Sequence, residues 1–505
     1  MGAFKSLENF SALANGCTPL SSHVSDMRIR GIALGFLSIT VGACSAASRA
    51  VPLPSPAAVA ARDLTEEEQA RHALDRLAFG PRPGEVERIR NTGVDRWIAM
   101  QLDPEDLRDD EGERIAAALP LASARPENAL DGLRNVSQAD TVARRAARQR
   151  AAEVSRQLQV ARVARAVASE RQLQEVLVDF WANHFSVFAG KGPVRLYVAQ
   201  YEQEAIRPHI LGHFRDLLGA VAHSPAMLVY LDNWRSAADS QHPTLAGTVV
   251  RRGRRGIVRQ PRAPRRPRGL NENYARELLE LHTLGVDGGY TQQDVIEVAR
   301  AFTGWTIAAP QAGGGFVFRP AMHDAGEKTV LGTHVRAGGG ESDGERVLDL
   351  LARHPATARL VAMKLVQRLV SDDPPPALVD RVAAVYTRTD GDLHEVVRAI
   401  VTSPEFFSRA AYRSKVKSPL ELVASGMRAV GAPADPTPRA ARMVAQLGQP
   451  LYGHRDPNGW PERSSEWLSA GSVVSRINFG VALAGRAALG DSLRRALESP
   501  DFQRR

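Results

Sequence analysis

The chain has 505 residues, of which 44% are hydrophobic and 24% are charged, the balance of a soluble globular protein. This length is ample for a large buried core. No stretch approaches the ~20 consecutive apolar residues that a membrane-spanning helix needs. The formal net charge is +9, so a polyanionic partner has to be considered.

An export signal is predicted near the start of the chain. The stretch "MRIRGIALGFLSITVGACSAAS" begins at Met27 with two arginines, and an apolar run follows at 31–41. Two small residues then precede Cys44, an order that resembles a bacterial lipobox, where the signal is cleaved and the cysteine takes lipid. The alternative is a short hydrophobic helix with a chance cysteine. The order of charge, apolar run and small residues favours the lipoprotein.

The mature chain is therefore expected to sit in the cell envelope, held by a lipid on Cys44, in the periplasm or at the outer membrane. Met27 is the predicted start, and residues 1–44 form the signal and lipobox region. Ser45 is not Asp, so nothing argues for retention at the inner membrane. Cys17 is the only other cysteine, so the mature chain has no thiol for a disulfide, a thiolate zinc site or a nucleophile.

The remaining chain is predicted to be mainly α, a multi-helix bundle with one small β-hairpin after Trp305. Residues 45–63 are rich in Pro, Ala and Ser and are typical of a flexible tether. Residues 64–489 are predicted to form one large helical domain, and residues 490–505 a C-terminal tail.

Helical periodicity and capping signals place the predicted helices. Thr65 with Glu68, and Thr291 with Asp294, have the spacing of capping boxes. An apolar stripe through 141–188 predicts core packing. Further helices are predicted over 201–232, 271–284, 292–303, 343–353, 355–371, 377–388, 393–402, 419–430, 437–447 and 473–489.

The positive charge is concentrated in one segment. Residues 249–269 hold nine arginines and no acidic residue, within a predicted disordered insertion at 236–269. Arginine runs can bind nucleic acid, but this one has no aromatic residue for base stacking and contains three prolines, so no nucleic acid partner is predicted. Contact with anionic lipid is a second reading. A solvated, disordered insertion is favoured.

The stretch "NENYARELLELHTLG" from Asn271 carries the densest set of charged residues. Glu272, Arg276 and Glu280 are spaced i, i+4, i+8 and predict a ladder of opposite charges. Glu277 and Glu280 share a neighbouring face. His282 points elsewhere, so any site here needs ligands from other segments.

Two histidines elsewhere could complete such a site. His184 lies between Trp181 and Phe185, where a polar ring needs a partner. With His323 and Asp324, the helix carboxylates have the donor types of a divalent metal site or of an acid–base pair. The structural alternative makes Glu277 a buried partner of Arg276, Arg300 or His184, and this alternative is favoured. For His323 and Asp324 alone a turn is favoured.

The predicted candidates are therefore explicit. His184, Glu277 and Glu280 are the candidate catalytic residues. His184, Glu277, Glu280, His323 and Asp324 are the candidate metal ligands. The loop "GQPLYGHRDPNGWPERSSEW" offers Tyr452, Trp460 and Trp467, which could bind a sugar ring or a peptide. A loop pinned to the core by Trp460 is an equally good reading.

Several motifs occur in one order and carry a family resemblance. They are "LDRLAFGPRPGEVERI", "FWANHFSV", "GLNENYARELLELHTLGVDGGYTQQDVIEVARAFTGW", "FVFRPAMHDAGEKTVLG", "HPATARLVAMKLVQRLV", "KSPLELV" and "LGQPLYGHRDPNGWPERSSEWLSAGSVVSRINF". Over about 66–489 the chain resembles the bacterial family catalogued as domain of unknown function 1800. The resemblance implies an exported, mainly helical protein without an assigned chemistry. It also implies an exported partner from a second family, similar in fold to alkaline phosphatases and sulfatases. The arginine-rich insertion departs from the family pattern.

Two functions follow as hypotheses. The favoured one is a lipid-anchored binding or assembly factor that acts with an exported partner. The alternative is a metal-assisted hydrolase of an envelope polymer. Convergence of His184, Glu277, Glu280 and His323 in one cleft would favour the enzyme.

Overall fold

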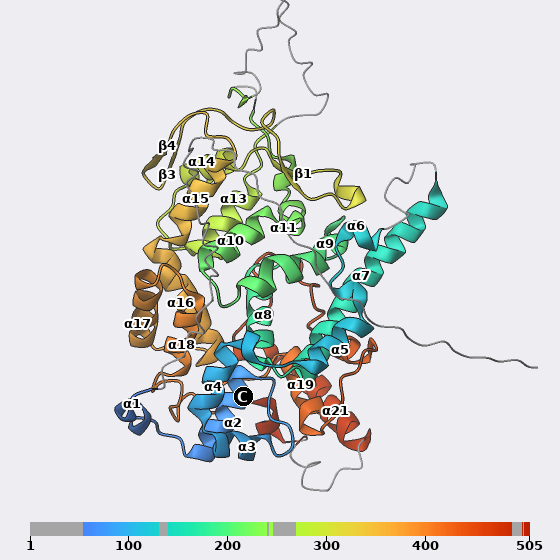
Figure 1. The fold of residues 1–505 in the computed structure, drawn as a ribbon, viewed down its shortest axis with the longest axis vertical. Helices are drawn as coiled ribbons and strands as arrows, with labels where there is room; N and C mark the ends of the chain where they lie inside the picture. Colours follow the sequence, from blue (N-terminus) through green and yellow to red (C-terminus); the bar gives the residue numbers. More distant parts are fainter. Residues whose placement is uncertain (1–53, 131–139, 240–241, 246–268, 487–496, 498) are drawn as a thin grey trace, which may run out of the picture. The chain divides into compact units, whose positions relative to one another are not determined.

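The computed structural model describes residues 54–130, 140–239, 242–245, 269–486, 497 and 499–505 (Figure 1). The predicted signal and lipobox region, residues 1–44, lies outside the described residues. Helices dominate the described part of the chain, and the strands found there form two small antiparallel sheets. The prediction of a mainly α fold is confirmed. None of the helices in these ranges combines the length and the apolar character needed to cross a bilayer.

The first part of the chain forms short helices that precede one long helix. Thr65 caps the second of them through a complete capping box with Glu68, which confirms that prediction. Arg125 precedes the last of them, and Pro126 opens it. The helices are α1 (Pro56–Ala60), α2 (Glu66–Leu77), α3 (Glu85–Thr92), α4 (Val94–Leu102), α5 (Asp110–Ala118) and α6 (Pro126–Ala129), with short 3₁₀ turns at Pro104–Asp106 and Pro120–Ala122.

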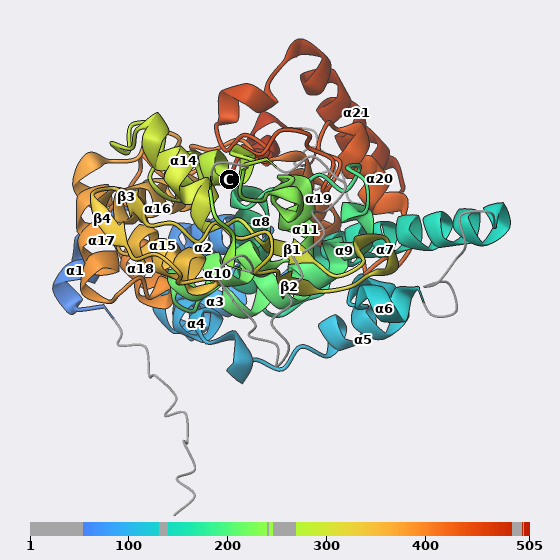
Figure 2. The same cartoon turned by 90° about the horizontal axis from the view of Figure 1, so that it is seen from above.

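The long helix α7 (Thr141–Ala168) and its successor α8 (Gln172–His184) supply the centre of the core. Asp140 caps α7 by accepting a hydrogen bond from the Ala143 amide. Figure 2 shows the start of α7 extending past α6. The predicted apolar stripe is buried throughout, at Val154, Leu158, Val163, Val167, Leu173, Leu177 and Trp181.

The middle of the chain contains two π-helical segments and both sheets. β1 pairs with β2, and β3 pairs with β4, each antiparallel. The prediction of one hairpin is therefore refined to two, because Phe316–Phe318 pairs back with Trp305–Ile307 and leaves Lys328–Val330 to pair with the strand after it. The elements are α9 (Val194–Gln200), the π-helix η3 (Tyr201–Ile206), η4 (Arg207–His209), α10 (Phe214–His223), α11 (Pro225–Tyr230), η5 (Asn233–Arg235), α13 (Asn273–Glu277), the π-helix η6 (Leu278–Thr283), α14 (Gln292–Ala301), β1 (Trp305–Ile307), η7 (Pro310–Ala312), β2 (Phe316–Phe318), β3 (Lys328–Val330) and β4 (Thr333–Val335).

The last part of the chain is again helical, and its helices follow the predicted bounds within a few residues. Ser418 caps the fifth of them in a capping box with Glu421. The elements are α15 (Ser342–Ala352), α16 (Pro355–Leu369), α17 (Pro376–Arg388), α18 (Leu393–Val401), α19 (Pro419–Ala429), α20 (Arg439–Gln446), η8 (Ser464–Trp467), α21 (Ala470–Arg486) and η9 (Pro500–Gln503).

Residues 499–505, part of the predicted C-terminal tail, contact the helical domain. The main chains of Lys415 and Arg505 exchange hydrogen bonds of 3.2 and 2.8 Å. The buried Arg505 guanidinium pairs with Glu421 at 3.0 Å. A buried arginine needs such a partner, so this segment is fixed to the domain. Residues 490–496 and 498 lie outside the described residues.

Helices α2 and α3 lie against the C-terminal part of the described chain (Figure 1). Arg428 of α19 pairs with Glu85 of α3 at 2.9 Å and donates a 2.6 Å hydrogen bond to the Gly80 carbonyl. Arg76 of α2 donates to the Ala411 carbonyl at 2.6 Å. These contacts join helices more than three hundred residues apart in the sequence into one unit.

Two predicted flexible segments are shorter than expected. The side chain of Arg62, inside the predicted tether, is 1% exposed, pairs with Asp95 at 2.7 Å and lies over the Phe407 ring. Ser236, at the start of the predicted insertion 236–269, is fully buried and accepts a hydrogen bond from the Asn271 amide. Specific partners in the fold hold both positions. The arginine run at 246–268 lies outside the described residues.

Candidate functional site

His184 ends α8 and occupies an aromatic enclosure, as its sequence neighbours suggested. Its ring centroid lies 5.3 Å from that of Trp181 and 4.5 Å from that of Phe185. The side chain is 5% exposed. Its two polar partners come from distant segments: the carbonyl of His282 in η6 and the ammonium of Lys364 in α16.

These partners define the protonation of His184. The Nε2 atom lies 3.2 Å from the His282 carbonyl oxygen, which can only accept, so Nε2 carries the proton. The Nδ1 atom then accepts from Lys364 Nζ at 3.4 Å. Burial, and then the Lys364 charge, hold the pKa of His184 well below its ordinary value. Burial also lowers the pKa of Lys364. The pair is a neutral imidazole beside a partly buried amine.

The Gly/Pro loop after α20 is fastened beside this pair. The side chain of Asn183 accepts a hydrogen bond from the Trp460 amide at 2.7 Å and donates to the Trp460 carbonyl at 2.8 Å. Gly459 has a φ of +71°, and a Cβ at this position would lie 2.4 Å from the Asn183 carbonyl oxygen. Only glycine fits this approach. The loop is therefore held through the backbone of Trp460, and its indole is left for other contacts.

Of the three predicted aromatic loop residues, Trp460 is the one that shares a cavity with His184, and Trp467 lines a separate, much smaller pocket. Trp460 is half-buried, with its ring 4.6 Å from that of His454. Tyr452 is buried and donates a 2.6 Å hydrogen bond to Glu202. Trp467 is buried, and its Nε1 donates to the Pro461 carbonyl at 3.0 Å. The Tyr452 bond holds the loop to the core, and the Trp467 bond joins two parts of the loop itself.

His184 and Trp460 line the same cavity, which we call the His184–Trp460 cavity. Its volume is about 280 Å³. The wall carries amide, carboxylate, amine and imidazole groups around one indole, a mixture that can form many hydrogen bonds. The lining residues are Phe180, Asn183, His184, Lys364, Gln367, His454, Asn458, Gly459, Trp460, Pro461, Glu462 and Glu466.

Glu277 and Glu280 are near each other but do not line this cavity. Burial, and then the charge of Glu280, raise the pKa of Glu277, and Arg276 partly opposes them. Glu277 instead lines a separate cavity of about 400 Å³. Lys191 and Arg455 also line that cavity, and Arg455 belongs to the loop that carries Trp460. Of the predicted charge ladder, the Glu272–Arg276 pair is present at 3.3 Å. Beyond it the helix becomes π-helical, which alters the spacing that was assumed.

His323 and Asp324 belong to a separate buried network. Asp324 pairs with Arg300 at 2.7 Å. His323 Nε2 lies 3.2 Å from Asp343, which also pairs with Lys328 at 2.9 Å. Each acid already has a cationic partner in this interior, an arrangement typical of a structural clamp.

The five predicted metal ligands therefore do not gather into one site. Within the described ranges, no group of three or more His, Cys, Asp or Glu side chains is arranged to hold a metal ion. The physical reason is that the acidic groups beside His323 already form ion pairs, Asp324 with Arg300 and Asp343 with Lys328. The catalytic roles of His184, Glu277 and Glu280 stay predictions.

Several polar residues of the cavity wall were not predicted, among them Lys364, Asn183 and Glu462. Lys364 lies on an ordinary amphipathic helix, and its contact with His184 spans 180 positions in the sequence. Asn183 directly precedes His184, and its position beside that candidate was the one available signal. Glu462 lies two positions after Trp460, in the loop that was singled out for its aromatic and polar residues.

Comparison with known proteins gives one match. A family model described as "Protein of unknown function (DUF1800)" matches residues 72–504. The chain belongs to this family. No curated protein and no solved structure matches the chain. The family match extends through both the α8 segment and the loop that form the His184–Trp460 cavity.

Proposed function

We propose that the protein is an exported, lipid-anchored envelope protein that binds carbohydrate in the His184–Trp460 cavity. The observation that carries this proposal is the meeting of Trp460, His184 and Lys364 in one cavity of about 280 Å³. A sugar ring presents an apolar face and a rim of hydroxyl groups. The indole can pack against the face, and the polar wall can bind the hydroxyls.

The chemistry of the wall supports a polyhydroxylated ligand over an apolar one. Asn458, Gln367 and Glu462 line the cavity with groups that accept or donate hydrogen bonds. The neutral His184 donates to the His282 carbonyl and accepts from Lys364, so it is committed to positioning the Lys364 amine at the wall. An amine and a carboxylate at one wall can each hold a different hydroxyl group.

The location and the partner are part of the same proposal. The predicted lipobox at Cys44 would place this cavity at an envelope surface, where glycans are abundant. An exported partner similar in fold to phosphatases and sulfatases, as the family resemblance implies, would then act on or assemble with the bound polymer. The binding or assembly role remains the favoured function.

Hydrolysis of an envelope polymer is the second candidate, and one contact favours it. Lys364 lies 3.4 Å from the Nδ1 atom of His184 inside the cavity. An amine with a lowered pKa beside a neutral imidazole is a combination that can transfer protons. A metal could assist such a reaction, although the five ligands first predicted are not its site.

Calorimetric titration of the purified protein with soluble envelope oligosaccharides tests the binding proposal. Trp460→Ala is expected to weaken binding about ten-fold, because it removes the stacking surface while the Asn183 contacts to the backbone remain. Trp460→Phe, which keeps an aromatic face, is the matched control and should retain most of the affinity. Equal affinity of all three proteins for every oligosaccharide would contradict the proposal.

Release of new reducing ends during the same titration distinguishes hydrolysis from binding. If His184→Gln and Lys364→Met stop that release but still bind, the second candidate is correct. If no reducing ends form with the parent protein, the binding function stands alone.

A further inference from the structure

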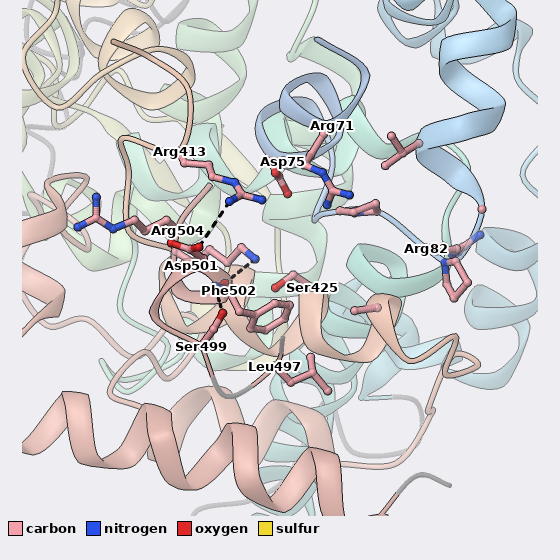
Figure 3. Close-up of a pocket in the computed structure, with 16 residues that line it drawn as sticks. Arg71, Asp75, Arg82, Arg413, Ser425, Leu497, Ser499, Asp501, Phe502 and Arg504 are labelled. Carbon is pink, nitrogen blue, oxygen red and sulfur yellow. Dashed lines mark hydrogen bonds and ion pairs between the residues drawn. The ribbon is translucent and has the colours of Figure 1, made fainter. Parts of the chain in front are cut away.

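A second cavity lies at the junction of α2, α19 and the C-terminal segment (Figure 3). Its volume is about 460 Å³, and it shares no lining residue with the His184–Trp460 cavity. A volume of this order suits a small organic ligand. We call it the Arg71–Lys417 cavity.

The charge of its lining is strongly positive. Arg71, Arg82, Arg413, Lys417 and Arg504 line it, against only Asp75 and Asp501. This leaves a formal excess of three positive charges around one cavity. Such a concentration of like charge favours the binding of an anion.

The lining cations differ in how many of their N–H groups already have a partner in the protein. Arg82 pairs with Glu170 at 3.0 Å and also donates to two carbonyls. Arg71 makes no hydrogen bond or ion pair of its own within the described part of the chain, and its guanidinium lies in the cavity wall. Its planar donor fork is therefore available to a ligand.

Asp75 interacts electrostatically with three of these cations, Lys417, Arg71 and Arg413. Figure 3 shows Asp75 between the guanidinium groups of Arg71 and Arg413. The residue is 8% exposed. Burial raises the pKa of Asp75, and Lys417, Arg71 and Arg413 oppose that rise. Arg413 also pairs with Asp501 at 3.7 Å. Two carboxylates do not neutralise the five lining cations, so an additional negative charge would be stabilised beside Arg71 and Lys417.

Lys417 lies deeper in the same cavity. Its Nζ donates to the Phe502 carbonyl at 2.8 Å and lies 4.1 Å from the centre of the Phe502 ring. Burial lowers its pKa to about 8, so most of the ammonium groups keep their charge at pH 7. The side chain has further N–H groups that can donate to a bound anion.

Apart from Ser425 and Ser499, the rest of the wall is largely apolar. Pro83, Val86, Ala429, Leu497 and Phe502 line the cavity beside the cationic groups. An inorganic anion would leave this surface without a partner. A ligand that joins an anion to an apolar group would use both parts of the wall.

We propose that the Arg71–Lys417 cavity binds a phosphate monoester whose ester group is apolar. A phosphate monoester carries between one and two negative charges at neutral pH, about −1.5 to −2, which suits a wall with more than one uncompensated cation. Its oxygens match the donor fork of Arg71 and the ammonium of Lys417. The apolar group lies against Phe502 and Leu497. The ester can come from a soluble compound or from a lipid headgroup.

Calorimetry with phenyl phosphate, inorganic phosphate, phenol and benzoate tests the proposal on the purified protein. Phenyl phosphate is expected to bind at least about ten-fold more tightly than any of the other three, because it alone uses both parts of the wall. No binding of phenyl phosphate, or tighter binding of benzoate, would overturn the proposal.

Two variants locate the binding. Arg71→Met is expected to weaken phenyl phosphate binding at least about ten-fold, since it removes the donor fork but keeps a long side chain on a partly exposed helix position. Arg96→Met is the matched control, because Arg96 is an exposed arginine of α4 that lines neither cavity. It should bind like the parent. Equal loss in both variants would mean a general charge effect and would overturn the site.

Sedimentation with phosphatidylcholine vesicles, with and without phosphatidic acid, separates the two sources of the ester. Binding only to vesicles with phosphatidic acid, reversed by phenyl phosphate and lost in Arg71→Met, assigns the site to a lipid headgroup. Phenyl phosphate binding without vesicle binding assigns it to a soluble ester. Vesicle binding that Arg71→Met does not change would place the lipid contact elsewhere and contradict a lipid in this cavity.

Discussion

His282 is a buried histidine whose protonation is coupled to the stability of the fold. It is fully buried beside Phe185 and His184, and neither ring nitrogen has a hydrogen-bond partner among the described residues. Burial, and then Lys364, lower its pKa to about 3. The unfolded chain binds a proton here below the ordinary pKa of 6.5, whereas the folded chain does not until about 3. Stability must therefore fall as the pH drops below 6.5.

Replacing His282 by leucine is expected to remove this loss. The free energy of unfolding of His282→Leu should decrease less between pH 7 and pH 5 than that of the parent, by about 2 kcal/mol. Urea unfolding at both pH values measures the difference. Oligosaccharide binding should be unchanged, because His282 contributes only its backbone carbonyl to His184.

His334→Leu is the control for this experiment, since His334 is 57% exposed on β4. It should leave the pH dependence as in the parent. An equal loss of stability in parent and His282→Leu would mean that His282 is protonated in the folded protein.

At the scale of elements, the loop that carries Trp460 depends on one glycine. A Cβ on Gly459 would lie 2.4 Å from the carbonyl oxygen and 2.6 Å from the side-chain oxygen of Asn183. Gly459→Ala is therefore expected to separate the loop from α8, to lower the free energy of unfolding by more than about 1 kcal/mol, and to abolish oligosaccharide binding.

Gly448→Ala is the matched control on the same loop. Gly448 also has a positive φ, +103°, but an added Cβ would meet nothing within 4 Å. This variant has the backbone strain without the collision, so it should lose some stability and keep its binding. If both variants bind equally well, the Asn183 contact does not position Trp460. Melting curves and calorimetry on both variants decide this.

Elements defined by local sequence could be predicted. Thr65 and Thr291 were identified as caps because a capping box depends on residues three positions apart, and both boxes are present. The helix bounds in the second half of the chain were predicted within a few residues for the same reason. The π-helix at Leu278–Thr283 was not predicted, since one extra residue in a turn leaves no pattern in the apolar spacing.

The site was only half predictable. His184 and Trp460 were selected by residue type, and they do line one cavity. Their partners could not be found from the sequence, because the bonds between Asn183 and Trp460 join positions 277 residues apart. The metal site was predicted from donor types alone. The sequence did not show that Arg300 and Lys328 lie close enough to form ion pairs with the carboxylates beside His323.

At the scale of the whole molecule, buried ion pairs run from the core to the C-terminal segment. Asp179 of α8 pairs with Arg162 of α7 at 2.6 Å and with Arg368 of α16 at 3.0 Å. Arg368 and Arg505 both lie 3.0 Å from Glu421 of α19. All of these side chains are buried, so each charge depends on its neighbours for compensation.

Acid should weaken this chain of ion pairs at Glu421. Burial raises the pKa of Glu421, but Arg505 and Arg368 outweigh it and hold the pKa at about 2, against an ordinary value of 4.5. A carboxyl group with a lowered folded pKa contributes stability that is present above 4.5 and is lost as the pH falls towards 2. The shift corresponds to about 3 kcal/mol.

Arg505→Met tests whether the end of the chain closes this network. Removing one partner of a buried pair is expected to lower the free energy of unfolding at pH 7 by about 3–5 kcal/mol. The pKa of Glu421 should also move back towards 4.5, so the further loss between pH 5 and pH 3 should be smaller than in the parent. Urea unfolding at these three pH values measures both effects, with the exposed Arg504→Gln as control.

Combining Arg505→Met with Glu421→Gln should lower the free energy of unfolding by less than the sum of the two single changes, because the double variant leaves no unpaired carboxylate. If Arg505→Met unfolds like Arg504→Gln, the last residues add no stability through Glu421, and the contributing ion pairs are those among α7, α8 and α16.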